Sequence, residues 1–204
     1  MFEILLNELE QENSNEPILY FKGILPILIT APHTMKQLKS DGTYKYSEPY
    51  TKALAKYISE ELGTHYLIKV NDTGIDANSE ELEEFKLKLI DVINENDIKL
   101  VIDLHGAEKE RDFDVELGTL NNISADYSTI HELKEAFIEN GVKNVEINNP
   151  FKGGGITRCV YLSTDAEAIQ IEINGKYRDQ NDIESIKKIY ESLIQFIKQY
   201  CNFN

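Results

Sequence analysis

Three polar residues lie at or within apolar segments of this chain, and their types could do chemistry together. His33 follows the apolar segment in ILPILITAPHT, and His105 ends the segment KLVIDLH. In a third segment, AIQIEIN, an extended backbone places Gln170 and Glu172 on one face and the isoleucines on the other. A buried carboxylate needs a charged partner or a metal ion nearby, or else it stays protonated. We therefore expect the two histidines and Glu172 to share one site.

Two histidines and an acid are typical of a zinc hydrolase. Such sites use three protein ligands and leave one position open for water, while a carboxylate that is not a ligand acts as general base. For the third ligand we consider Glu48 first, at the start of a predicted helix, although it could be an ordinary first-turn acid. Asp76 is the substitute. Asp103 either orients the His105 imidazole or caps the loop after its strand.

Alternating apolar and amphipathic segments predict the elements that would position these residues. Strands are expected at residues 24–32, 65–70, 99–105, 113–119, 144–148 and 167–173. Helices are expected at residues 47–62, 79–95, 129–140 and 181–200, with Ser47 and Asn78 as N-caps of the first two. We predict one α/β domain over residues 1–204 with a mixed central sheet, and a site at the carboxyl ends of its strands.

Composition narrows the possible partners and compartments. The formal net charge of −15 would repel a phosphate backbone, so we expect no nucleic-acid partner. The apolar segments are shorter than the roughly 20 residues that span a bilayer, and the acidic start MFEILLNELEQEN lacks the basic region of a secretion signal. We expect a cytoplasmic protein with no membrane partner. Cys159 and Cys201 are too few for a disulfide framework.

The segment FKGGGITR at 151–158 has two interpretations. Three glycines allow the backbone to approach a ligand closely, and Arg158 could bind a carboxylate through its planar fork of donors. A plain flexible loop is the alternative. The segment around Asp76 also has two interpretations. It is either a loop before a helix or a part of the substrate pocket.

Six short motifs together resemble the N-formylglutamate amidohydrolase family, which is part of a wider group of zinc hydrolases that includes zinc carboxypeptidases and cell-wall amidases. In the order of that family, they are APHT at 31–34, a DxN segment at 76–78, IDLHG at 102–106, DVELGT at 114–119, NNPFKGGGITR at 148–158 and AIQIEIN at 168–174. The resemblance implies a three-layer α/β fold and a Zn²⁺ cofactor.

The resemblance also implies a role for several residues. His33 and His105 would be zinc ligands, with Glu48 as the third by analogy with the cell-wall amidases. Glu172 would be the general base, and Arg158 would hold the carboxylate of a small amide substrate. Lys152 or Arg178 could assist Arg158. The expected function is therefore hydrolysis of a small N-acyl amino acid.

Two other functions use the same residues. The first is hydrolysis of a peptide or cell-wall amide by the same zinc site. The second is a relative that binds a metal or ligand without catalysis, because Ser79 stands where the family usually has an arginine after the DxN segment.

Overall fold

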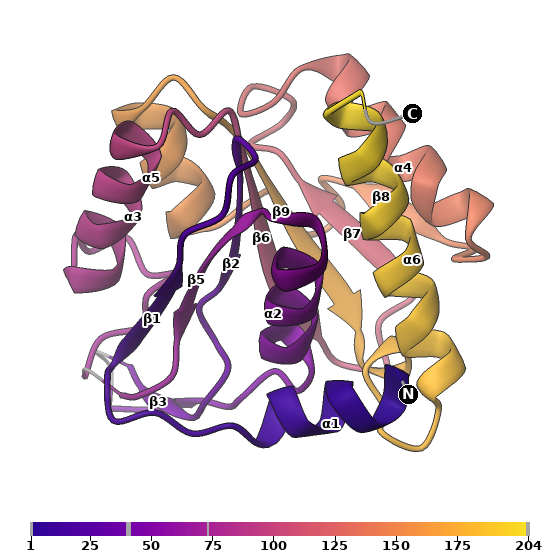
Figure 1. The fold of residues 1–204 in the computed structure, drawn as a ribbon, viewed down its shortest axis with the longest axis horizontal. Coiled ribbons are helices and arrows are strands. Elements are labelled where there is room, and N and C mark those ends of the chain that lie inside the picture. Colours follow the sequence, from indigo (N-terminus) through magenta and orange to yellow (C-terminus); the bar gives the residue numbers. More distant parts are fainter. Residues whose placement is uncertain (1, 40–41, 73, 203–204) are drawn as a thin grey trace.

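The computed structural model describes residues 2–39, 42–72 and 74–202, and its centre is a mixed seven-stranded sheet (Figure 1). The strand order is β1-β5-β2-β6-β9-β7-β8. Their bounds are β1 (Ile18–Phe21), β2 (Ile27–Ala31), β5 (His65–Lys69), β6 (Leu100–Ala107), β7 (Val115–Gly118), β8 (Val145–Ile147) and β9 (Glu167–Asn174). The pairs β1–β5 and β7–β9 are antiparallel and the other pairs are parallel. A separate two-stranded sheet pairs β3 (Gln37–Leu38) with β4 (Tyr44–Lys45).

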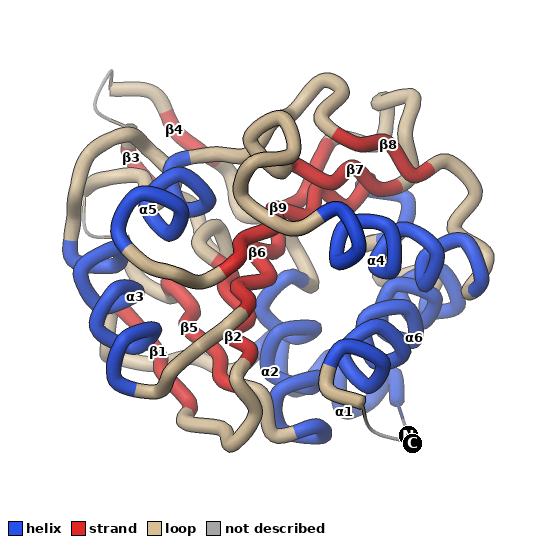
Figure 2. The backbone as a smooth tube through the Cα atoms, turned by 90° about the horizontal axis from the view of Figure 1, so that it is seen from above, coloured by secondary structure: helices blue, strands red, loops and turns tan. Residues whose placement is uncertain are grey.

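Helices cover both faces of the large sheet, which gives three layers (Figure 2). One face packs against α1 (Phe2–Gln11), α2 (Thr51–Leu62), α4 (Tyr127–Glu139) and α6 (Ile183–Tyr200). The other packs against α3 (Glu84–Glu95) and α5 (Gly155–Ser163). A short 3-10 helix, η1 (Gly175–Tyr177), follows β9. The predicted α/β architecture with a mixed central sheet is confirmed.

All six predicted strands and all four predicted helices are present, but two of the helices begin four or five residues later than expected. Helix α2 begins at Thr51 after Tyr50, which has a left-handed φ of 67°, so Ser47 is not its N-cap. Helix α3 begins at Glu84 and is capped by the Glu83 carboxylate.

Asn78 has a different capping role from the one expected. Its side-chain oxygen accepts a hydrogen bond from the backbone N–H of Ile156, in the first turn of α5, at 3.0 Å. The helix that Asn78 caps is therefore far along the chain from the one predicted, because the loop after β5 folds back onto α5.

The elements that the sequence did not predict are α1, β1, β3, β4, α5 and η1. Helix α5 begins in the glycine run, where helix propensity is low. A Cβ on Gly155 would lie 1.9 Å from the carbonyl oxygen of Ser79. The glycine therefore allows the start of α5 to pack against the loop that contains Asn78.

Strand register places the polar residues at one end of the sheet. The isoleucines of β9 belong to the core on the α2 and α6 side, whereas Gln170 and Glu172 face the other side, as expected. Thr30 of β2 pairs with Asp103 of β6, and His105 of β6 pairs with Glu172 of β9. The carboxyl ends of three adjacent parallel strands thus carry the candidate site.

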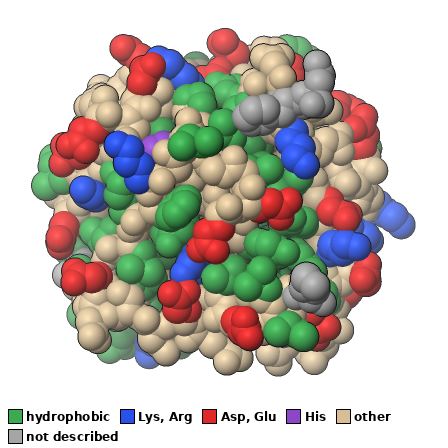
Figure 3. All heavy atoms as spheres, in the orientation of Figure 1, with side chains coloured by type: hydrophobic (Ala, Val, Ile, Leu, Met, Phe, Trp, Pro, Cys, Tyr) green, Lys and Arg blue, Asp and Glu red, His purple; other side chains and the backbone are tan. Residues whose placement is uncertain are grey.

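On the face of the molecule drawn in Figure 3, the negative charge is spread out rather than gathered in one place. In the view of Figure 3, acidic side chains are distributed across the whole face and are interspersed with basic and hydrophobic ones. The net charge of −15 therefore does not mark one charged patch on this face. Among the helices of the described residues, none is long and apolar enough to cross a membrane.

Candidate metal centre and active site

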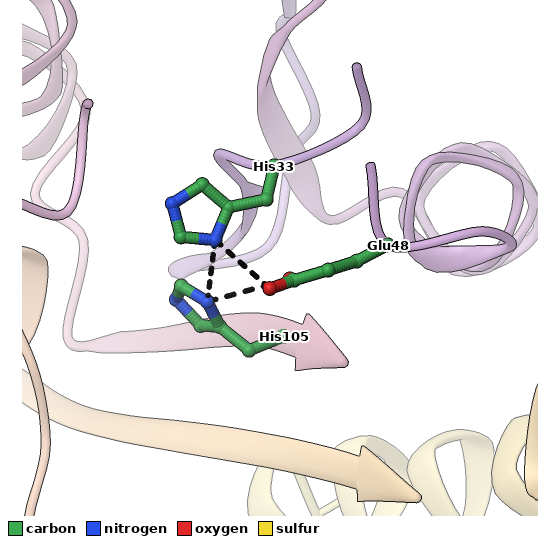
Figure 4. A group of neighbouring side chains, drawn as sticks. All are labelled: His33, Glu48 and His105. Atoms are coloured by element: carbon green, nitrogen blue, oxygen red, sulfur yellow. Dashed lines mark hydrogen bonds and ion pairs between the residues drawn. The ribbon is translucent and has the colours of Figure 1, made fainter. Parts of the chain in front are cut away.

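His33, Glu48 and His105 converge on one point, and all three side chains are buried (Figure 4). The Nδ1 atoms of the two histidines are 3.1 Å apart. Glu48 Oε1 lies 3.1 Å from His33 Nδ1, and Glu48 Oε2 lies 3.5 Å from His105 Nδ1. One potential ligand atom from each residue lies within 4.8 Å of the others. Two imidazole nitrogens and a carboxylate oxygen at this spacing could hold a metal ion.

The opposite nitrogen of each imidazole is bound to an aspartate. His33 Nε2 lies 2.7 Å from Asp76 Oδ1, and His105 Nε2 lies 2.8 Å from Asp103 Oδ2. Thr30 Oγ1 donates to the other oxygen of Asp103 at 2.6 Å. Metal-bound histidines in proteins almost always have such a partner, which fixes the ring and makes it a better ligand. Both rings thus direct Nδ1 toward the centre, and Asp76 lies behind His33 rather than beside Glu48.

We expected Glu48 in the first turn of α2, but it lies in the loop three residues before the helix. Its backbone N–H donates to the carbonyl oxygen of His33 at 2.8 Å, and its Oε2 accepts from the N–H of Gly106 at 2.9 Å. These two bonds tie the loop to the ends of β2 and β6. They hold the carboxylate between the two histidines.

The charges within the cluster stabilise one another. Burial alone would raise the pKa of Glu48, but the imidazoles of His33 and His105 lower this pKa well below its usual value. Burial would lower the pKa of His105, but the carboxylates of Asp103 and Glu48 raise it well above its usual value. Burial would raise the pKa of Asp76, but the hydrogen bond and charge of His33, with the Asn78 N–H and Lys45, together lower it. The carboxylates of Glu48 and Asp76 therefore remain ionised, which favours binding of a cation.

Glu172 lies next to this cluster without being part of it. Its side chain is 8% exposed, and its Oε1 accepts a hydrogen bond from Gln170 Nε2 at 2.8 Å. Burial raises the pKa of Glu172 above its ordinary value, and the nearby Glu48 raises it further, while His105 opposes the rise. A buried carboxyl with a raised pKa beside a metal site can accept and release a proton.

Two side chains at this site were missed by the sequence analysis. Lys45 Nζ lies 2.6 Å from Glu48 Oε1. Burial lowers the pKa of Lys45, but the carboxylates of Glu48, Glu172 and Asp76 raise it above its ordinary value. No periodic pattern or strand end marks Lys45 in the sequence.

Glu116 is the other missed residue. It lies opposite Glu172 on the adjacent strand β7 and is fully buried. Burial and the neighbouring Glu172 raise the pKa of Glu116 to about 8. The sequence marks Glu116 only as one letter of the DVELGT motif, because its neighbour depends on the register of two strands.

The three basic residues predicted to bind substrate are not brought together. Arg178 lines a cavity of about 260 Å³ that opens beside Glu48. Arg158 is on α5, where its Nη1 lies 2.8 Å from Glu80 Oε2 and its side chain is half exposed. Lys152 is exposed in the glycine-rich loop. Neither Arg158 nor Lys152 is among the residues that line this cavity.

The fold is a mixed α/β fold of the kind seen in solved amidohydrolase and amidase structures. The chain is similar to the N-formylglutamate amidohydrolase from Ralstonia eutropha JMP134, with 14% identity over 91% of this chain and 98% of that chain and a TM-score of 0.63. It is also similar to a bacteriophage poly-gamma-glutamate hydrolase. The identity is 13% over 95% of this chain and 94% of that chain, and the TM-score is 0.65. A third similar structure is the N-acetylmuramoyl-L-alanine amidase from Clostridium difficile 630. Its identity to this chain is 13% over 87% of this chain and 97% of that chain, with a TM-score of 0.51.

The family comparison agrees with the motifs. The model of the N-formylglutamate amidohydrolase family matches residues 87–177, which confirms the resemblance. The matched segment contains His105 and Glu172, while His33 and Glu48 precede it. Comparison with curated proteins gives no significant match. The family match supports amide hydrolysis as the general reaction.

Proposed function

We propose that this chain is a zinc-dependent amidohydrolase that cleaves a small N-acyl amino acid similar to N-formylglutamate. The observation that carries the proposal is the convergence of His33 Nδ1, His105 Nδ1 and one Glu48 oxygen within 4.8 Å. Two nitrogen ligands and one carboxylate form a ligand set typical of catalytic zinc. Both imidazoles are already oriented by carboxylates on their far side.

His33, Glu48 and His105 would hold the zinc ion, with Asp103 and Asp76 orienting the histidines. When bound, zinc supplies Lewis acidity that activates water and polarises the amide carbonyl. Two features suit these side chains to a zinc ion. One is the set of donor atoms, and the other is the ionised state of Glu48, whose pKa is held low by the two imidazoles. The three ligands together carry one negative charge, which suits a divalent cation with an open position.

Glu172 would move the proton. In this proposal it takes a proton from the attacking water and passes it to the leaving nitrogen of the amide, giving a carboxylic acid and an amine. Gln170 donates to Oε1 of Glu172, so Oε2 is the oxygen assigned to proton transfer. The position of Glu172 beside His105 in the sheet supports this role.

A metal analysis combined with an activity assay tests the proposal. Purified protein should contain about one zinc per chain and should release formate from N-formylglutamate. His33→Ala and His105→Ala should lose both the metal and the activity. His131→Ala is the matched control, because His131 lies on α4 against the Tyr127 ring and should leave both unchanged. No stoichiometric zinc in the wild type, or metal retained in both site variants, would contradict the metal centre.

A second substrate class is an amide in a peptide or in the cell wall. The similarity of the fold to the Clostridium difficile amidase favours including such substrates in the assay. Cleavage of short peptides or muramoyl peptides in preference to N-acyl amino acids would assign this class. Zinc binding without hydrolysis of either class would assign a binding protein that lacks catalysis. The protein is expected to act as a cytoplasmic single domain.

A further inference from the structure

We propose that Lys45 binds the carboxylate of the substrate, and that Lys45 rather than Arg158 makes this site selective for anionic amides. The inference rests on the proposed function and extends it to substrate recognition. It starts from the small β3–β4 sheet, which places Lys45 in the wall of the cavity beside the metal centre.

The cavity has a size suited to a small substrate. It measures about 260 Å³ and is lined by Tyr44, Lys45, Tyr46, Ser47, Glu48, Gly106, Ala107, Glu108 and Arg178. Pockets for drug-sized ligands are larger, at roughly 300–1,000 Å³. Because Glu48 is both a candidate metal ligand and part of this wall, a molecule in the cavity would lie directly beside the metal centre.

The lining contains two cationic side chains, and one of them is already engaged. Arg178 donates Nε to the carbonyl oxygen of Ile173, Nη1 to that of Pro49 and Nη2 to that of Ala107. Its guanidinium covers Gly106, where a Cβ would lie 2.3 Å from Cζ. Arg178 therefore binds the backbone along both edges of its guanidinium and holds the wall of the cavity in place.

Lys45 has donors to spare. Its one ion pair in the described part of the chain is with Glu48 Oε1 at 2.6 Å, and 32% of its side chain is exposed. An ammonium group has three N–H donors on a flexible stem. Lys45 can thus keep its bond to Glu48 and donate to a second carboxylate in the cavity.

The residues that flank Lys45 suit the carbon atoms between an amide and a carboxylate. Tyr44 is 51% exposed and Tyr46 is 73% exposed, and both line the cavity. Lys36 Nζ lies 3.8 Å from the centre of the Tyr44 ring, which holds that ring at the rim. Both rings offer apolar contact surface in the same cavity that Lys45 lines. The substrate class is therefore a short, carboxylate-bearing amide.

The test compares a charged substrate with its uncharged analogue. For the zinc-loaded protein, KM and kcat would be measured with N-formylglutamate and with its neutral diamide. Lys45→Gln should raise KM for N-formylglutamate by roughly 10-fold or more, the effect expected when a charge-assisted hydrogen bond is lost. The Lys45→Gln variant should have the same KM for the diamide and the same zinc content as the wild type. Lys45→Arg should restore much of the preference for N-formylglutamate over the diamide.

A matched control and a binding measurement complete the design. Lys187→Gln removes an equivalent lysine that pairs with Glu191 on α6, away from the cavity, and should behave as wild type. Calorimetry with glutamate, which carries the same carboxylates, should show binding to wild type and weaker binding to Lys45→Gln. This measurement does not require turnover, so it tests Lys45 even if the protein hydrolyses none of the substrates.

Three results would overturn the inference. The first is a Lys45→Gln variant that keeps the preference for the charged substrate. The second is an Arg158→Gln variant that loses this preference while Lys45→Gln does not. The third is a wild-type protein that binds no glutamate. Failure of the proposed function would differ from all three, because it would appear as absence of zinc or of hydrolysis in the wild type.

Discussion

The carboxylate of Asp103 holds the imidazole of His105 from the same strand, with 2.8 Å between Oδ2 and Nε2. Two residues apart on β6, both side chains point to the same face of the sheet, and each is almost completely buried. Thr30 on β2 donates to the second oxygen of Asp103. The acid and the histidine that end this apolar strand thus form one unit, in which Asp103 orients His105.

Asp103→Asn should weaken metal binding without unfolding the protein. The amide keeps the shape of the side chain but removes the charge that makes His105 a strong ligand. Loss of such a partner typically costs 10–100-fold in metal affinity. Competition with a chromogenic chelator would measure the change. Asp97→Asn is the control, because Asp97 is a surface residue paired with Lys99, and an unchanged affinity in Asp103→Asn would contradict this role.

Glu172→Gln should abolish most of the turnover while the metal remains bound. General acid–base groups typically contribute about 10²–10⁴-fold to the rate, so kcat should fall by a factor in this range. Metal analysis of the same preparation separates this effect from metal loss. A variant that keeps both its metal and its full kcat would show that Glu172 is not the base.

Glu116 should make the free energy of unfolding fall as the pH rises. Its pKa in the folded protein is about 8, against an ordinary value of 4.5, so the folded state binds this proton more tightly than the unfolded state. The resulting destabilisation should be absent below about pH 4.5, should grow between about pH 4.5 and 8, and should then level off.

Glu116→Gln removes this dependence, because the amide resembles the protonated carboxyl. At pH 8 the variant should be more stable than wild type by about 4 kcal/mol, or roughly 8–16 °C in Tm. At pH 5 the two proteins should unfold at similar temperatures. Thermal unfolding from pH 5 to 9 measures the effect, with the exposed Glu135→Gln on α4 as control. A constant difference in Tm across this range would refute the prediction.

Gly155→Ala should destabilise the protein, because its Cβ would lie 1.9 Å from the carbonyl oxygen of Ser79. Relief of this clash requires α5 to move away from the loop that carries Asn78. Overpacking of this kind typically costs about 1–3 kcal/mol. Gly175→Ala is a milder comparison, since the nearest atom to its Cβ would be 3.2 Å away. Equal Tm values for the two variants would contradict the proposed packing.

The strands and the positions of the two histidines could be predicted because they follow local patterns. The central strands are apolar on both faces, and His33 and His105 come directly after or at the end of such segments. Helix α5 could not be predicted, because it begins at the end of a glycine run of low helix propensity, and the contact with Ser79 that requires Gly155 is a tertiary one.

The remaining site residues depend on contacts between distant segments. Lys45 lies in the two-residue strand β4, which is too short to give a sequence pattern, and its role follows from the position of Glu48. Glu116 becomes notable only when β7 pairs with β9 and places it opposite Glu172. Residue types alone left the third ligand undecided between Glu48 and Asp76. The structure brings Glu48 to the histidines because its loop is bonded to His33 and Gly106.

The three carbonyl contacts of Arg178 have a consequence for metal exchange. They join the ends of β6 and β9 to Pro49, the residue after Glu48. The backbone around the cluster is therefore preorganised by the protein itself, and the ion would not have to bear the entropic cost of ordering three distant segments. Metal loss and reloading should then be reversible events of a folded protein, with dialysis against a chelator leaving the fold intact.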